Sequence, residues 1–289
     1  MSGGAKMSGH DDGDLITAGV DVGSGAVKTV VMRHHGAEAL VLALREERIR
    51  RRDLRQVIVE NFEGALAEAG VPREKVDYIA TTGEGDLVDF RRGHFFGMTT
   101  HARGGIFLDP EARAVLDVGA LHARAIRMDE RSRVLGYRMT SQCASGSGQF
   151  LENIARYLGV SLEELGSLSI EGKSPEEVSS ICAVLAETDV INMVSRGIDV
   201  RDILKGIHLS MAGRLVRLLA AAGARGVVLV TGGLARDTGL VACLREEAAK
   251  QKVAVEVRVS ERSIHAGALG AALWGAFRHR RLASRGRAA

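Results

Sequence analysis

The chain has 289 residues, of which 46% are hydrophobic and 26% are charged, a balance that is typical of a folded globular protein and excludes a disordered or fibrous one. Lysine and arginine number 39 against 36 acidic residues, and aromatic residues make up only 4%, so no nucleic-acid partner is expected. No apolar run reaches the roughly 18 residues of a membrane span, and the N-terminus lacks the layout of a signal peptide. The sequence therefore predicts a cytoplasmic protein of two domains, with no membrane partner.

The N-terminal part of the chain predicts a run of strands followed by a helix. Residues 1–14 are rich in Gly, Ser, Asp and His, which is typical of a mobile leader. Apolar, β-branched segments predict strands at residues 15–21, 26–32 and 39–44. A helix is predicted over 53–69 and a further strand over 76–81, whereas His34 and His35 are expected to face solvent.

An internal repeat occurs at a constant offset of 96 residues. Residues 18–32 (AGVDVGSGAVKTVVM) resemble residues 114–128 (AVLDVGALHARAIRM), and a third strand is predicted after each copy, over 134–140 in the second. The matched pairs include Asp21 with Asp117, Gly23 with Gly119, and Lys28 with Arg124. The repeat indicates two copies of one module, and the alternative is chance similarity between two apolar hairpins.

The remainder of the chain is predicted to be mostly helical. Helices are expected at residues 149–158, 161–165, 180–195, 199–222, 237–250 and 265–277, with strands at 227–231 and 253–259. The class is α/β, and the absence of a Pro-rich linker indicates that crossing helices join the lobes. The predicted division is a first lobe over 15–112, on which helix 265–277 packs back, a second lobe over 113–277, and a basic tail over 278–289.

The two Asp-x-Gly turns are candidate phosphate sites. In the first, Gly23, Ser24 and Gly25 offer backbone N–H groups and a hydroxyl to an anion, with Lys28 nearby. Asp21 cannot bind phosphate itself but has the oxygen ligands that suit Mg²⁺. The second turn, with Asp117 and Gly119, is expected to close on the same phosphates from the opposite lobe. Asp21 and Asp117 are therefore the candidate catalytic residues.

Two glycine-rich segments near the C-terminus are candidates for binding the rest of a nucleotide. Gly232 and Gly233 follow a strand and allow close approach of a flat ligand such as adenine with its ribose. Gly267 and Ala268, at a helix start just after His265, are expected to form the other wall. Taken alone, each segment is more often simple strand-to-helix packing, but their order after two Asp-x-Gly turns favours the nucleotide interpretation.

The three cysteines differ in context. Cys143 precedes a Gly/Ser turn that opens a helix, and Cys182 follows a Ser-Ser pair suited to a helix N-cap, so both thiols are predicted near helix N-termini, where a thiolate is favoured. A [4Fe–4S] cluster takes four thiolates, so two from this chain require two from a partner. The alternative is that both are buried small apolar residues. Cys243 lies within a predicted helix and is expected in the core.

Together these motifs resemble the actin, Hsp70 and sugar kinase superfamily, which implies two βββαβα lobes of the ribonuclease-H type with a nucleotide cleft between them. More specifically, from about residue 15 to 277 the chain is similar to the ATPase subunits of benzoyl-CoA reductases and the activators of 2-hydroxyacyl-CoA dehydratases. The segments around Cys143 and Cys182 carry this closer resemblance. It implies ATP or ADP with Mg²⁺, and a [4Fe–4S] cluster held by these two cysteines and a partner subunit.

The second turn departs from that family. Where the family typically has Asp-Ile-Gly-Gly-Gln-Asp, this chain has Ala120, Leu121 and His122 after Gly119. Loss of the polar Gln and Asp indicates a specialised subunit that works beside a related ATPase subunit, and the resemblance is closest to the smaller, D-type subunits. It implies that reduced ferredoxin supplies electrons, which pass to reductase subunits that bind the acyl-CoA and dearomatise benzoyl-CoA.

Other functions remain open from the residues alone. A homodimeric dehydratase activator is the nearest alternative. A small-molecule kinase of the same superfamily would need a substrate pocket with a catalytic carboxylate, and a filament or scaffold protein would need no cluster.

Overall fold

The computed structural model describes residues 14–140, 147–178 and 183–286. Its first elements are β1 (Leu15–Val22), β2 (Ala26–His35), β3 (Glu38–Arg48), α1 (Leu54–Ala69), η1 (Arg73–Lys75), β4 (Tyr78–Gly83), η2 (Gly85–Leu87), β5 (Gly93–His94) and α2 (Gly97–Leu108). The next are β6 (Ala112–Val118), β7 (Ala123–Met128), β8 (Val134–Met139), α3 (Gly148–Leu158), α4 (Leu165–Glu171), α5 (Ala183–Ser195) and α6 (Val200–Ala221). The chain ends with β9 (Gly226–Thr231), η4 (Gly233–Arg236), α7 (Thr238–Lys250), β10 (Val255–Arg258), η5 (Ser263–His265) and α8 (Ala266–Gly286).

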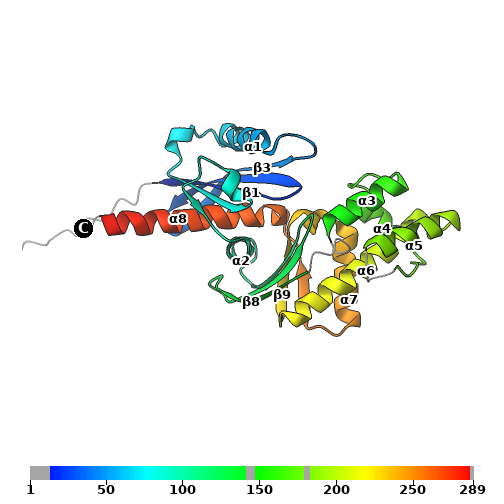
Figure 1. Ribbon diagram of the computed structural model, residues 1–289. Coiled ribbons are helices and arrows are strands. Elements are labelled where there is room, and N and C mark those ends of the chain that lie inside the picture. Colours follow the sequence, from blue (N-terminus) through cyan, green and yellow to red (C-terminus); the bar gives the residue numbers. More distant parts are fainter. Residues whose placement is uncertain (1–13, 141–146, 179–182, 287–289) are drawn as a thin grey trace, which may run out of the picture.

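The strands form two five-stranded sheets with the same connectivity (Figure 1). The order β3-β2-β1-β4-β5 in the first sheet corresponds, strand by strand, to β8-β7-β6-β9-β10 in the second. In each sheet the repeated hairpin is antiparallel, and its first strand also pairs in parallel with a later strand: β1 with β4, which follows α1, and β6 with β9, which follows helices α3 to α6. Asp21 lies opposite Lys28, and Asp117 lies opposite Arg124. The predicted duplication is therefore confirmed.

Helices cover both faces of each sheet. In the first sheet, Val20 and Val31 pack against α1, whereas Val30 and Met32 point to the other face and pack against α8. In the second sheet, α2 covers the face that includes Ile126, and α6 and α7 cover the other. Helices α8 and α2 consequently lie side by side between the two sheets (Figure 1). No helix within the described ranges has the length and apolar character needed to cross a membrane.

The crossing of α2 and α8 depends on glycines. A Cβ on Gly270 would lie 1.8 Å from the carbonyl oxygen of Thr100, and one on Gly104 would lie 2.0 Å from that of Ala266. Both distances are far below van der Waals contact, so any side chain at either position would push the two helices apart. These backbones approach because no Cβ stands between them.

Alanine at Gly270 is expected to lower the free energy of unfolding by roughly 1–3 kcal/mol, because the obstructing atom is backbone that cannot rotate away. Gly64→Ala is the matched control, since its Cβ would meet only the flexible side chain of Arg45 on β3. This change should be neutral or stabilising by up to about 1 kcal/mol through helix propensity. Urea unfolding of both variants tests the difference, and equal stabilities would contradict this account of the crossing.

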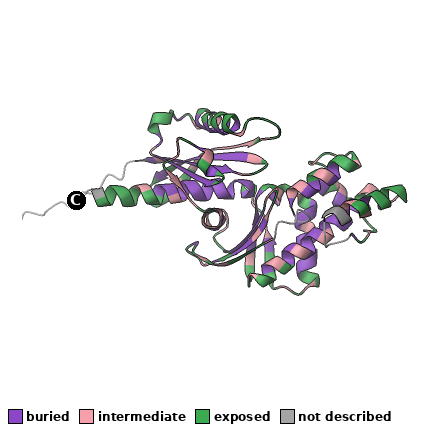
Figure 2. Ribbon diagram, viewed as in Figure 1, coloured by how far each residue is buried: buried purple, intermediate pink, exposed green. Residues whose placement is uncertain are grey.

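Three element predictions differ from the structure. Helix α2 was not predicted, because its Thr and Gly residues have low helix propensity and tertiary packing against α8 stabilises it. The helix predicted over 161–165 is wrong: Glu164 Oε2 accepts hydrogen bonds from the Ser161 N–H and hydroxyl in a turn, and α4 begins only at Leu165. Helix α8 continues to Gly286, so residues 278–286 are helical, and Figure 2 shows exposed residues toward that end.

His34 does not face solvent as expected. It is 3% exposed, and its Nε2 lies 2.8 Å from Thr17 Oγ1 between β2 and α8. Burial, with a smaller contribution from the charge of Arg280, lowers the pKa of His34 from 6.5 to about 4. The folded protein therefore holds this imidazole neutral.

The free energy of unfolding is expected to fall as the pH is lowered from 6.5 to about 4. In that window the unfolded chain binds a proton at residue 34 that the folded chain does not bind, and one such proton corresponds to a slope of up to ~1.4 kcal/mol per pH unit. His34→Gln should remove this one-proton contribution, so the free energy of unfolding should depend less steeply on pH. Urea unfolding at steps between pH 7 and pH 4 measures it, and identical slopes would disprove the assignment.

Candidate functional site

The first predicted phosphate turn is a tight hairpin at the end of β1. Asp21 is the second-last residue of β1, is 9% exposed, and lies next to Thr82 on β4. The Gly23 N–H donates to the Ala26 carbonyl at 3.1 Å, while the side chain of Ser24 is exposed at the tip. The Gly23 N–H is therefore used within the hairpin, and the exposed Ser24 hydroxyl is the group that the tip presents to a ligand.

The second turn repeats this geometry and touches the first. The Gly119 N–H donates to the His122 carbonyl at 2.9 Å. A Cβ at Gly25 would lie 3.4 Å from the Cβ of Ala120, so the turns of the two lobes meet. The carbonyls of Gly119 and Ala120 accept hydrogen bonds from the N–H groups of Gly148 and the next residue, at 3.0 and 2.9 Å. The second turn is thereby tied to the start of α3.

A glycine with positive φ lies beside each aspartate. Gly83 has φ 69° and is the last residue of β4, the parallel neighbour of the Asp21 strand. Gly232 has φ 82° and directly follows β9, the parallel neighbour of the Asp117 strand. A Cβ at Gly83 would lie 3.1 Å from Asp21 Oδ1, and one at Gly232 would lie 2.6 Å from Asp117 Oδ1. The Thr-Gly pairs at 82–83 and 231–232 are thus equivalent by the duplication, a signal present in the sequence that extends the predicted repeat.

The Asp117 carboxylate is held by the guanidinium of Arg124 and lies near the imidazole of His101. Arg124 Nε and Nη2 lie 2.9 and 2.8 Å from Asp117 Oδ2, and His101 Nδ1 lies 3.7 Å from Oδ1. Burial alone raises the pKa of Asp117, but the nearby charges of His101, Arg124 and Lys28 outweigh it and hold this pKa below its usual value. Asp117 is therefore an ionised carboxylate that already has partners.

Asp21 contrasts with its counterpart. It has no ion-pair partner among the described residues, and its carboxylate lies between two glycines: a Cβ at Gly267 would lie 2.5 Å from Asp21 Oδ2. A carboxylate without a protein cation suits a Mg²⁺ ion, whose remaining ligands are commonly waters and phosphate oxygens. The described residues contain no group of three His, Cys, Asp or Glu side chains around one metal position. Asp21 is thus the residue that fits a Mg²⁺ bound together with a nucleotide.

The predicted adenosine residues lie on both sides of these turns. A Cβ at Gly233 would meet no atom within 4 Å, so there is open space at this backbone. Arg236, at the end of η4, is ion-paired with Glu46 of β3 and so joins this segment to the first sheet. Gly267 adjoins Asp21, whereas Ala268 is fully buried in the core beneath β2 and does not line the site.

His265, directly before α8, is a buried residue that lacks partners. It is 6% exposed, and neither ring nitrogen has a hydrogen-bond partner among the described residues. Burial is the main reason that the pKa of His265 is lowered to about 4. The imidazole is neutral at this position between the two lobes.

The cysteines fall into two groups. Cys143 and Cys182, the predicted cluster ligands, lie outside the described residues. Cys243 is fully buried on α7, and burial raises the pKa of its thiol to about 11. The prediction that Cys243 belongs to the core is confirmed.

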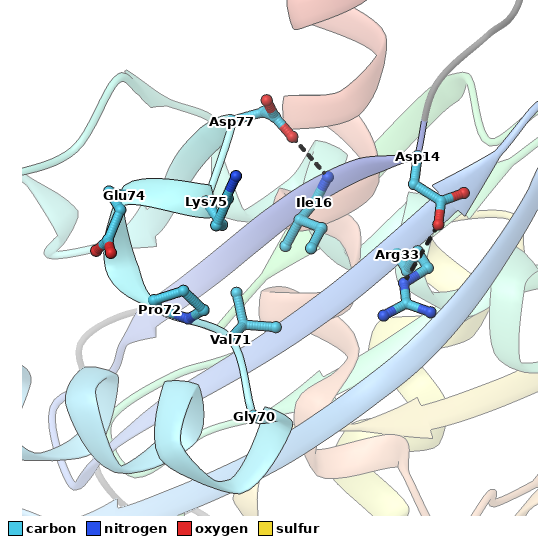
Figure 3. A pocket seen from close by; sticks show the side chains of 9 residues that line it. All are labelled: Asp14, Ile16, Arg33, Gly70, Val71, Pro72, Glu74, Lys75 and Asp77. Carbon is cyan, nitrogen blue, oxygen red and sulfur yellow. Dashed lines mark hydrogen bonds and ion pairs between the residues drawn. The ribbon is translucent and has the colours of Figure 1, made fainter.

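A cavity of about 520 Å³ lies elsewhere, at the start of β1 (Figure 3). Asp14 and Arg33 form an ion pair at 3.7 Å on its rim, and Asp77 accepts a hydrogen bond from the Ile16 N–H at 2.8 Å. Asp14, Arg33 and Asp77 are therefore each already bonded to another group of the protein. Because Ile16 and Asp21 are near opposite ends of β1, this cavity is separate from the phosphate turns.

Sequence reasoning did not single out two residues of the site. His101 of α2 is 3% exposed, with its Nδ1 2.9 Å from Thr231 Oγ1, and its Nε2 would lie 2.9 Å from a Cβ at Gly267. Arg124 was noticed only as the match to Lys28. No sequence signal marks His101, because α2 itself was not predicted.

Comparison with known proteins matches residues 18–275 to the BadF/BadG/BcrA/BcrD ATPase family. The chain is 63% identical over 272 residues to the D subunit of the benzoyl-CoA reductase of Thauera aromatica, a match that covers 94% of this chain and 96% of that protein. The solved structure of the activator of the 2-hydroxyisocaproyl-CoA dehydratase from Clostridium difficile, with bound ADPNP, is 30% identical and has a TM-score of 0.84 over 94% of this chain and 98% of that one.

A more distant structure shares only the fold. The ROK family glucokinase from Streptomyces griseus is 13% identical, with a TM-score of 0.54 over 91% of this chain and 99% of that one. This likeness confirms the predicted two-lobe α/β fold of the sugar kinase type. The family model, which spans most of the chain, and the 63% identical relative confirm the predicted resemblance as well. By these two findings, the chain belongs to the BadF/BadG/BcrA/BcrD ATPase family.

Proposed function

We propose that this chain is the D-type, ATP-binding subunit of a benzoyl-CoA reductase, an oxidoreductase that reduces the aromatic ring. The observation that carries this proposal is the 63% identity to the D subunit of a benzoyl-CoA reductase over nearly the full length of both chains. Identity to the dehydratase activator is about half as high, at 30%, which makes the homodimeric activator the less favoured alternative. We place the subunit in the cytoplasm, where reduced ferredoxin and acyl-CoA substrates are available.

The nucleotide is proposed to bind where the two turns meet. Asp21 would hold Mg²⁺, and Ser24, Gly25 and Lys28 would bind phosphate from the first lobe. Gly23, whose N–H bonds to the Ala26 carbonyl, would shape the turn. Gly119, whose N–H bonds to the His122 carbonyl, would shape the second turn and allow it to approach the phosphates from the other lobe. Gly232 and Gly233 would face the adenosine, with Gly267 opposite. The free carboxylate of Asp21, the meeting of the turns and the open space at Gly233 support this assignment.

Cys143 and Cys182 are proposed to hold half of a [4Fe–4S] cluster. The four-thiolate requirement assigns the other two cysteines to a related ATPase subunit. When bound, the cluster would supply one-electron transfer from reduced ferredoxin, which is oxidised, to the reductase subunits. Two such electrons and two protons from the medium would add two hydrogen atoms to the ring of the acyl-CoA.

The second turn offers a path from nucleotide to cluster. Gly119 and Ala120 accept hydrogen bonds from Gly148 and Gln149, the first residues of α3. Cys143 precedes α3 by only a few residues in the chain. A nucleotide that repositions this turn would therefore shift the segment that carries Cys143, and so couple ATP to electron transfer.

Anaerobic co-expression with the related ATPase subunit and the reductase subunits tests the function. The complex is expected to reduce benzoyl-CoA only when both ATP and reduced ferredoxin are supplied, and to contain one shared cluster for each pair of ATPase subunits. This chain expressed alone should contain no cluster. A stable homodimer that holds a full cluster and activates a 2-hydroxyacyl-CoA dehydratase would replace the proposal with the activator alternative.

A further inference from the structure

We propose that Arg124 is a phosphate-binding residue, positioned by Asp117, and that the second turn binds the nucleotide through this arginine and not through a metal ion. The inference rests on the proposed nucleotide-binding function and specifies the chemistry of its second half. It assigns unequal roles to two aspartates that the internal repeat makes equivalent.

The first step concerns the Asp117 carboxylate. Its Oδ2 accepts hydrogen bonds from two nitrogens of Arg124, and its Oδ1 lies near His101. The Nδ1 atom of His101 lies 2.9 Å from Thr231 Oγ1. A cation that coordinates Oδ2 would have to displace the guanidinium, and one that coordinates Oδ1 would lie beside both Arg124 and His101. Asp21, whose register partner is Lys28, has no such pair among the described residues, so only the first turn presents an available carboxylate.

The second step concerns the donors that Arg124 has left. A guanidinium carries five N–H donors, and the contacts with Asp117 use Nε and Nη2. Nη1 has no acceptor among the described residues and lies close to Gly97, the first residue of α2, where a Cβ would be 2.8 Å away. The Arg124 side chain is 32% exposed, so part of it reaches the surface, in contrast to the buried Asp117 carboxylate. An arginine held by a carboxylate on one side presents its other side in a fixed orientation, as phosphate recognition requires.

The third step concerns the counterpart in the first lobe. Lys28 matches Arg124 in the repeat, is 7% exposed and has no acidic partner among the described residues. Lys28 lies opposite Asp21 beside the first turn, Arg124 lies opposite Asp117 beside the second, and the two turns meet. The charge of Lys28 also helps to lower the pKa of Asp117 in the other lobe. Two cations from opposite lobes around the meeting turns form an anion site that closes on the phosphates.

The test is ATP affinity of the full chain, measured by calorimetry with Mg²⁺ and again in EDTA. Arg124→Gln is expected to weaken ATP binding roughly ten- to hundredfold in both conditions, since charge-assisted hydrogen bonds to phosphate are lost. Arg124→Lys should recover part of the loss, because it keeps the charge without the planar fork. AMP, which lacks the outer phosphates, should bind all variants alike.

Two further variants control for folding. Arg127→Gln changes an exposed arginine on the same strand and should leave ATP affinity unchanged. Arg124→Gln combined with Asp117→Asn removes both charges, so no unpaired buried carboxylate remains. This double variant should fold and still bind ATP weakly in EDTA.

The outcomes separate this inference from the proposed function. If the wild-type chain binds ATP but Arg124→Gln has wild-type affinity in EDTA, the inference is overturned while the function stands. A loss confined to the Mg²⁺ condition would equally overturn it, since that loss would indicate a metal on the second turn. A wild-type chain that binds no nucleotide would refute the proposed function together with it.

Discussion

Serine in place of Cys143 or Cys182 is expected to leave the anaerobically purified complex without its [4Fe–4S] cluster and without reductase activity. Each substitution removes one of the four thiolates that are proposed to hold the iron, and a serine hydroxyl does not ionise at neutral pH to replace it. Iron and acid-labile sulfide analysis of the complex measures the loss, and weaker association of the two ATPase subunits should accompany it if, as proposed, the cluster bridges them.

Cys243→Ser is the matched control for these variants. Cys243 is fully buried on α7 and is not a proposed cluster ligand, so the substitution should leave the iron content unchanged. A Cys143→Ser complex that keeps its full iron content would disprove the ligand assignment. Exposure of the wild-type complex to air should bleach the cluster, since a site between subunits is open to oxygen.

Asp21→Asn is expected to abolish most of the Mg²⁺-dependent gain in ATP affinity. The amide keeps the size of the side chain but removes the negative charge that attracts the ion. Because Asp21 has no protein cation as partner, the substitution breaks no ion pair within the described chain, and the fold should persist. Calorimetric titration of ATP with and without Mg²⁺ gives the result, with the affinity in EDTA close to that of the wild type.

Asp117→Asn should behave differently from Asp21→Asn. It loosens Arg124 and leaves that guanidinium without its buried carboxylate, so ATP affinity should fall in Mg²⁺ and in EDTA alike. Wild-type affinity in Asp117→Asn, together with lost affinity in Asp21→Asn, would indicate that the second turn is vestigial and that only its hairpin survives.

The sequence by itself determined the duplicated α/β modules, the family and the position of both turns. These features are local: strand alternation, the Asp-x-Gly turns and the helix caps depend on residues within a few positions of one another. Asp53 and Asp237, for example, are the N-caps of α1 and α7, and each carboxylate accepts a hydrogen bond from the N–H of the residue three positions later. The offset of 96 then predicted that the hairpins would have the same register, as they do.

Only the tertiary structure decided how the two halves differ. Helix α2 is stable because glycines let it pack closely on α8. This helix places His101 near both Asp117 and Gly267, although Gly267 is distant in the sequence. The ion pair between Asp117 and Arg124 is likewise invisible in the repeat, which matches Arg124 only to Lys28. Contacts between side chains of different elements depend on distances that packing sets. The periodicity of a sequence predicts which face of a helix or strand a residue occupies, but it does not predict which residues contact that face.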